Sequence, residues 1–160
     1  MRNPLGVCCQ QLKTRTTEHK MGHSSIARCS CGFVSDELFC ASNMRDFQTV
    51  CNAAVICNVC GHIGTINLLE DGELAPWVLG MWNSSETLGG GLKTEDSPRC
   101  PSCESTNIDV AVGPTEPNGP MPQVAEWCAG DEFIYFLPGP YRCPACGEKK
   151  LIIRKHSLCD

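Results

Sequence analysis

Short runs of apolar and β-branched residues, separated by turn residues, recur along the chain and predict a mostly β structure. Ile, Val, Phe and Tyr, which favour strands, dominate these runs, and Gly, Pro, Asn or Asp flanks them. The strands predicted on this basis cover residues 63–69, 107–112, 132–136 and 149–154. Because the runs are short, we expect small cores rather than one deep core.

One segment has helical rather than strand spacing. Met44, Phe47, Val50 and Cys51 recur near the period of a helix, and a preceding Ser or Asn can cap its first turn. The pattern therefore predicts a short helix over residues 44–54.

Turn-rich stretches divide the chain into segments. The glycine run at residues 89–91, with the Gly and Pro residues before it, indicates a linker between two cysteine-containing units. We therefore expect a flexible leader at 1–25, a first unit at 26–70, a linker at 71–98, a second unit with a Pro/Gly-rich insertion at 99–156, and a tail at 157–160.

Composition changes this picture, because cores this small need additional stabilisation from cross-links within the chain. The 160 residues are 19% charged and 6% aromatic, and 14 of them are cysteine; disulfides or metal ions stabilise small domains of this kind. The sequence shows neither a secretory signal nor a stretch long enough to span a membrane. We therefore expect a reducing, cytoplasmic location, where thiols bind metal. A disulfide framework in an exported protein is the alternative.

Charge is unevenly distributed. Residues 1–28 carry a net charge of +4, residues 29–141 carry −12 and residues 142–160 carry +3, within a total of −5. An acidic body argues against broad, nonspecific binding to duplex nucleic acid, which needs a basic face. The basic ends leave room for a local contact with nucleic acid or with an acidic partner.

Eight cysteines fall in four close pairs, as metal ligands do. One or two intervening residues form a tight turn that directs both sulfurs at one ion, at about 2.3 Å for zinc. The pairs are Cys29/Cys31, Cys57/Cys60, Cys100/Cys103 and Cys143/Cys146. Two pairs complete one tetrahedral site, so these eight residues predict two bound Zn²⁺ ions.

Two of the pairs have the sequence of a zinc-ribbon knuckle, Cys-x2-Cys-Gly: residues 57–61 are CNVCG and residues 143–147 are CPACG. The third pair has Glu104 where that glycine is usual, and the first pair has one spacer residue instead of two. The chain thus resembles the zinc-ribbon family at the level of motifs. The resemblance implies two tandem four-cysteine ribbons, each a β-hairpin between knuckles, and implies a fold more than an activity.

The glycine linker favours sequential pairing of the knuckles, because it separates two self-sufficient modules. Sequential pairing places Cys29, Cys31, Cys57 and Cys60 on one ion and the other four cysteines on the second. An interleaved arrangement, with the first pair joined to the third and the second to the fourth, is the alternative.

The remaining cysteines are expected to be small buried hydrophobes or free thiols; they are Cys8, Cys9, Cys40, Cys51, Cys128 and Cys159. A third metal site is an open alternative, since His19 and His23 have a spacing that two imidazoles can use on one zinc, and Cys8 and Cys9 could complete it.

Catalysis is not expected from this sequence. Four complete cysteine pairs leave no open position on the metal, and no phosphate-binding loop, nucleophile elbow or small-molecule substrate site is evident. The function predicted first is a structural zinc protein that presents a protein-interaction surface, either strand edges or an apolar patch at Trp77 and Trp82.

Two other functions stay open. The first is nucleic-acid binding, or association with RNA polymerase as a transcription factor, through the basic residues near the C-terminus: Arg142, Lys149, Lys150, Arg154 and Lys155. The adjacent acids Asp131 and Glu132 add a partial resemblance to transcript-cleavage factors. The second is iron electron transfer, because residues 141–147 are also similar to a rubredoxin knuckle; ferric thiolate would be coloured, whereas zinc is not.

Overall fold

The computed structural model describes residues 22–41, 48–78, 97–113, 125–129 and 132–159. Twelve strands lie within these residues. Their bounds are β1 Gly22–Arg28, β2 Leu38–Ala41, β3 Asn52–Cys57, β4 Ile63–Asn67, β5 Leu69–Glu70, β6 Glu73–Leu74, β7 Ile108–Val110, β8 Val112–Gly113, β9 Ala125–Ala129, β10 Glu132–Phe136, β11 Tyr141–Arg142 and β12 Lys149–Cys159.

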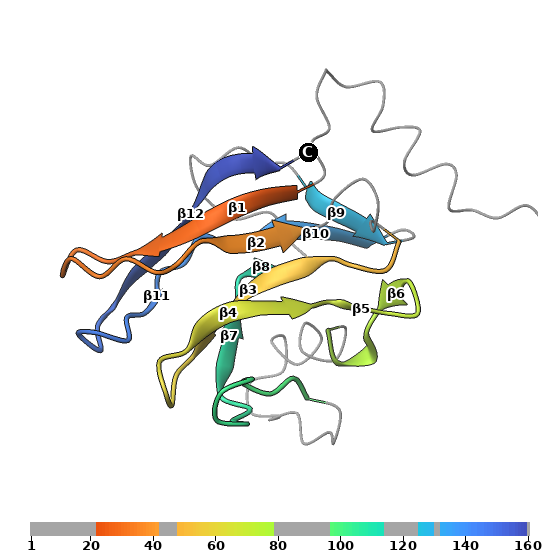
Figure 1. Ribbon diagram of the computed structural model, residues 1–160. Helices are drawn as coiled ribbons and strands as arrows, with labels where there is room; N and C mark the ends of the chain where they lie inside the picture. Colours follow the sequence, from red (N-terminus) through yellow and green to blue (C-terminus); the bar gives the residue numbers. More distant parts are fainter. Residues whose placement is uncertain (1–21, 42–47, 79–96, 114–124, 130–131, 160) are drawn as a thin grey trace, which may run out of the picture.

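Antiparallel pairing arranges these strands in three sheets (Figure 1). The largest sheet has seven strands in the order β11-β12-β1-β2-β3-β4, with β7 also paired to β3. A second sheet has the order β8-β10-β9, and β5 and β6 form a two-stranded ribbon. The prediction of a mostly β fold is therefore confirmed.

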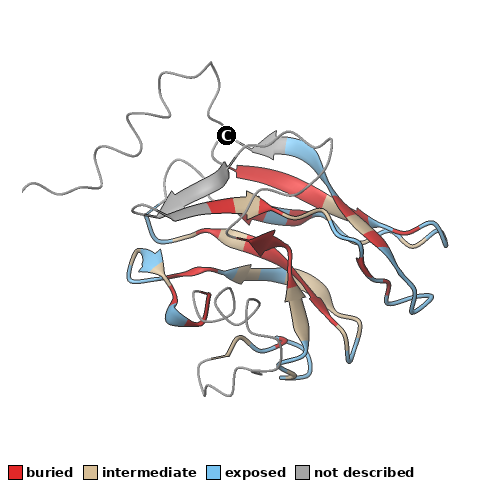
Figure 2. Cartoon of the chain, turned by 180° about the vertical axis from the view of Figure 1, so that it is seen from behind, coloured by how far each residue is buried: buried red, intermediate tan, exposed pale blue. Residues whose placement is uncertain are grey.

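Strand β3 is buried on both faces and separates two hydrophobic clusters. Ala54 and Ile56 pack into one cluster, together with residues of β1, β2, β10 and β12. Ala53 and Val55 pack into the other, with residues of β7, β8 and β10. A strand covered on both sides carries a continuous apolar run rather than an alternating one, which is what residues 53–57 show. Figure 2 shows this burial along the middle of the large sheet.

Long-range ladders bring the two cysteine-containing stretches of sequence into one sheet. Strand β1 pairs with β12 over its whole length, with Ala27 opposite Ile153. Strand β3 pairs with β7, with Cys57 opposite Ile108. Both ladders join a strand from residues 22–70 to a strand from residues 99–159.

The prediction of a helix over residues 44–54 is wrong for residues 48–54, which are the part of that range that the structure describes. Residues 52–54 begin strand β3, and residues 42–47 lie outside the described residues. The local helical spacing was overridden because β3 gains ladders with β4 and β7 and burial on both faces. Within the described residues, helical backbone occurs at residues 76–78 instead.

The boundaries of ordered structure also differ from the predicted segments. Strand β1 begins at Gly22, inside the stretch expected as a leader, and β12 continues to Cys159. In the stretch expected as a linker, Ala75, Trp77 and Val78 are buried. None of the helical structure in the described part of the chain is long and apolar enough to cross a bilayer.

Candidate metal centres

The eight paired cysteines converge on two groups of four. One group contains Cys29, Cys31, Cys143 and Cys146, and the other contains Cys57, Cys60, Cys100 and Cys103. Within each group all four sulfurs lie within 4.8 Å of one another. We call these groups the outer site and the inner site, because the outer site joins the first and last pairs in the sequence.

The spacing of the sulfurs fits a tetrahedral ion. In the outer site, Cys29 Sγ lies 3.8 Å from Cys146 Sγ and Cys31 Sγ lies 3.7 Å from Cys143 Sγ. In the inner site, the Cys57–Cys103 and Cys60–Cys100 sulfur distances are both 3.6 Å. Four sulfurs about 2.3 Å from a central ion would lie about 3.8 Å apart. Disulfide bonding would require about 2.05 Å, and all eight cysteines are free thiols.

The predicted sequential pairing is wrong, and so is the interleaved alternative. The first pair shares a site with the fourth, and the second with the third. The ladders explain this nesting. Cys29 directly follows β1 and Cys143 directly follows β11, while β1 and β11 both pair with β12. Cys57 ends β3, and Cys100 and Cys103 precede β7, its partner. Each site therefore takes one pair from residues 26–70 and one from residues 99–156.

All four knuckles close with the same two backbone hydrogen bonds. In the inner site, Cys57 N–H donates to the His62 carbonyl at 2.8 Å, and Gly61 N–H donates to the Cys57 carbonyl at 3.1 Å. The first pair makes both bonds one residue earlier, from Cys29 to Phe33 and from Gly32 to Cys29, each at 3.0 Å. A single spacer residue is therefore compatible with the same closure.

The residue that closes each turn adopts a left-handed backbone conformation. Gly32, Gly61 and Gly147 have φ values of 98°, 75° and 74°, and Glu104 has a φ of 60°. This conformation disfavours side chains. Glu104 stands where the other three knuckles have glycine, and it thus adopts the same left-handed backbone conformation as those glycines.

The two cysteines of each pair differ in burial, because the first is buried and the second lies at the surface. Cys29, Cys57, Cys100 and Cys143 are buried, whereas Cys31, Cys60, Cys103 and Cys146 are exposed. Backbone amides also support two of the buried sulfurs: Val59 N–H donates to Cys57 Sγ and Ser102 N–H donates to Cys100 Sγ, both at 3.4 Å. Such donors stabilise thiolates, the form that binds metal.

The thiols of each site differ sharply in their readiness to ionise. Burial opposes ionisation of Cys57, but backbone and thiol hydrogen bonds outweigh it and lower its pKa to about 6. In the outer site, the backbone N–H of Cys31 contributes most to lowering the pKa of Cys29 to about 7. Without metal, one thiolate in each site thus becomes the acceptor for its neighbours.

One other thiol in each site, Cys103 and Cys31, keeps its proton near neutral pH. The backbone of Ser105 favours the Cys103 thiolate, but burial and the hydrogen bonds to the other three sulfurs raise its pKa to about 12. Cys31 behaves alike: the backbone of Phe33 favours its thiolate, yet burial and its neighbours raise the pKa to about 12. A divalent ion must displace these protons before it is fully ligated.

The basic residues singled out from the sequence lie on two adjacent strands. Arg142 is on β11, and Lys149, Lys150, Arg154 and Lys155 are on β12. All five are exposed. Lys150 forms an ion pair with Glu148 at 3.7 Å, and Lys155 lies 5.7 Å from the centre of the Phe136 ring.

The two tryptophans proposed as a partner patch cannot be compared as a pair. Trp77 is 8% exposed and packs with Leu68, Val78 and Ile134 in a hydrophobic cluster. It therefore contributes to the core and offers little surface. Trp82 lies outside the described residues.

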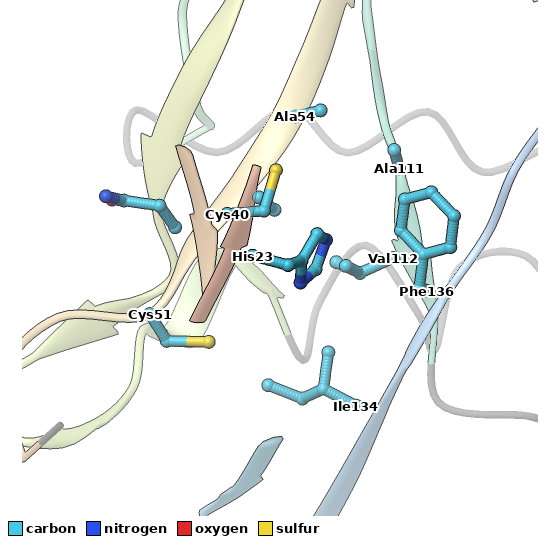
Figure 3. Close-up of a pocket in the computed structure, with 10 residues that line it drawn as sticks. His23, Cys40, Cys51, Ala54, Ala111, Val112, Ile134 and Phe136 are labelled. Atoms are coloured by element: carbon cyan, nitrogen blue, oxygen red, sulfur yellow. The ribbon is translucent and has the colours of Figure 1, made fainter. Parts of the chain in front are cut away.

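The other cysteines and histidines fall into two groups. Cys8, Cys9 and His19 lie outside the described residues, as do the side chains of Cys128 and Cys159. His23, Cys40 and Cys51 are buried and line a cavity of about 10 Å³ between the two larger sheets (Figure 3). His23 also makes an edge-to-face contact with Phe136, with 5.8 Å between ring centres. Sequence reasoning missed this cavity, because its lining comes from strands far apart in the chain.

Comparison with models of protein families, with curated proteins and with solved structures finds no match for this chain.

Proposed function

We propose that the chain is a non-catalytic zinc protein in which two Zn²⁺ ions, each held by four thiolates, fix a β scaffold of zinc-ribbon-like knuckles. The observation that carries the proposal is the spacing of the sulfurs, 3.6–3.8 Å in both sites. All-sulfur tetrahedral sets favour zinc or iron, and four protein ligands leave no position for a substrate or an activated water.

A structural role follows from what the sites connect. The outer site ties the turn after β1 to the turn before β12, and the inner site ties the end of β3 to the turn before β7. In each site the two cysteine pairs are separated by at least 40 positions in the sequence. Metal ligation therefore joins distant parts of the chain, and because the complete site exists only in the folded chain, the free energy of zinc binding adds to the free energy of folding.

Elemental analysis of the purified full chain tests this role. We expect two zinc ions per chain and a colourless protein, and we expect loss of near-UV circular dichroism when a strong zinc chelator is added. An iron content near two, with visible thiolate-to-iron absorption, would instead favour electron transfer.

The scaffold is proposed to act in a reducing, cytoplasmic compartment as an interaction module. Exposed large apolar side chains support a protein partner: Val34, Phe39 and Val59 are 49%, 63% and 64% exposed. Substituting Phe39 by Ser should leave the metal content unchanged and weaken capture of such a partner.

Nucleic-acid binding is the second candidate. It is supported by the exposure of all five basic side chains on β11 and β12, in a chain whose middle is acidic. Salt dependence separates the two candidates, because an interaction with phosphates weakens steeply as salt rises.

A further inference from the structure

An open pocket lies between the turns of the two metal sites. Its volume is about 380 Å³, within the range of ligand pockets. It is lined by Asn58, Asp109, Arg142, Gly147 and Lys149. Asn58 belongs to a knuckle of the inner site and Gly147 to a knuckle of the outer site, so the pocket exists only when both turns are in place.

Two cations on one wall of the pocket form no ion pair with any acidic residue in the part of the chain that the structure describes. Arg142 and Lys149 sit directly opposite each other on β11 and β12. Like charges at such a cross-strand position repel each other and destabilise a sheet. Within the described residues, neither side chain forms a hydrogen bond or an ion pair. An anion bound between them would remove the repulsion.

The opposite wall presents hydrogen-bond acceptors held in position. Asn58 donates through Nδ2 to Asp109 Oδ2 at 3.1 Å and to Asn107 Oδ1 at 3.3 Å. Its backbone N–H also donates to the Asn107 carbonyl at 3.0 Å. The amide donors of Asn58 are thereby used, which leaves its own side-chain oxygen and the second carboxylate oxygen of Asp109 as acceptors for a ligand.

We propose that this pocket binds one nucleotide unit of a single-stranded nucleic acid, with a phosphate between Arg142 and Lys149 and a base amino group at Asp109. A phosphodiester supplies the anion, and carboxylates accept hydrogen bonds from the amino group of cytosine. The acidic body disfavours a duplex, which would extend over it, whereas one strand needs only this local site. The inference rests on the second candidate function and deepens it.

The cations have a competing role that the experiment must separate. Four thiolates around a divalent ion carry a net charge of about −2, so neighbouring cations also favour the metal site itself. If that were the whole role of Arg142 and Lys149, substituting them would lower the metal content without a specific effect on nucleic acid.

The test is fluorescence anisotropy with the zinc-loaded full chain and short fluorescein-labelled oligodeoxycytidine and oligothymidine. The pocket variant is Arg142→Gln with Lys149→Gln, and the matched control is Arg28→Gln with Arg99→Gln, which removes the same charge at two exposed residues that lie outside the pocket lining and outside the basic group of β11 and β12. Zinc content is measured for each protein, so that loss of the metal sites is seen separately from loss of binding.

We expect the pocket variant to lose about tenfold or more in affinity for oligodeoxycytidine, and the control to lose less than about threefold. The wild-type slope of log affinity against log salt should be about −0.7, because the pocket neutralises one phosphate of a single strand. Equal losses in the two variants, or no binding by wild-type protein with both zinc ions present, would overturn the proposal. Equally effective competition by polyglutamate would overturn it in favour of an acidic protein.

Asp109→Asn tests the base contact. Cytosine presents an amino group where thymine presents a carbonyl, so the wild-type protein should bind oligodeoxycytidine more tightly than oligothymidine. The introduced amide can still accept the hydrogen bond from Asn58 but also carries donors, so the preference should shrink. A preference that Asp109→Asn leaves unchanged would contradict the assignment of the base to this wall.

Discussion

Gly61 of the inner site packs directly against Pro144 of the outer site. A Cβ atom placed on Gly61 would lie 2.7 Å from the Pro144 Cβ and 3.5 Å from its Cα. The first distance is shorter than any ordinary carbon–carbon contact. The two metal-binding turns are therefore in contact, and a change in one can reach the other.

Gly61→Ala should consequently destabilise the zinc-loaded protein more than an equivalent change elsewhere. Gly32→Ala is the matched control, because Gly32 has a φ of 98° but no atom within 4 Å of an added Cβ. A side chain in this backbone region costs about 1–2 kcal/mol, and overpacking at Gly61 should add about 1–3 kcal/mol. Urea denaturation compares the two variants, and equal losses would argue against a contact between the turns.

Metal affinity should rise with pH across the neutral range. At pH 7 the thiols of Cys31 and Cys103, whose pKa values are about 12, are protonated, so each site must release at least one proton when it binds zinc. The apparent affinity should therefore increase about tenfold or more per pH unit. Competition with a chelator of known affinity at several pH values measures this slope, and a flat profile would contradict it.

Acid should release the metal and with it the stability that the metal provides. Because the pKa of Cys57 is lowered in the fold, its thiolate stabilises the folded state. This contribution is complete above the ordinary pKa of a thiol and is lost as the pH falls towards about 6. In the absence of zinc, Cys57 takes up a proton as the pH falls through about 6, and protons then compete with zinc for this ligand of the inner site. Unfolding followed by circular dichroism should show a transition there that excess zinc shifts to lower pH.

Glu104→Gly should stabilise the protein. Glu104 holds a φ of 60°, which costs about 1–2 kcal/mol for a residue with a Cβ, whereas glycine loses about 0.5–1 kcal/mol through its freedom in the unfolded chain. We expect a net gain of about 0.5–1 kcal/mol. Glu104→Ala removes the same charge but keeps the strain, so it should give no comparable gain.

The metal-ligand residues could be recognised from the sequence, but their pairing could not. Close spacing is a local property: two sulfurs on one turn need only the residues between them. Which turns meet depends on the ladders of β1 with β12 and of β3 with β7. These ladders join residues far apart in the chain, such as Cys57 and Ile108, and nothing in the local pattern of either strand specifies its partner.

The contrast between local sequence signals and long-range strand pairing also explains which of the other predictions agree with the structure. Residues 132–136 were predicted as a strand and form β10, because their β-branched and aromatic run is a local signal. Residues 52–54 lie in a strand instead of the predicted helix because burial on both faces of β3 outweighs spacing. Asn58 and Asp109, which line the pocket between the sites, had no signal in the sequence, because a polar residue after a cysteine or within a strand is ordinary.

The nested pairing of the cysteines is tested by the zinc content of variants in which two cysteines at a time are replaced by serine. With nested sites, Cys29→Ser combined with Cys143→Ser removes two ligands from one site and should leave one zinc ion per chain on the inner site. Cys29→Ser combined with Cys57→Ser damages both sites and should leave none. The reverse result, one zinc ion in the Cys29/Cys57 variant and none in the Cys29/Cys143 variant, would contradict the nested arrangement.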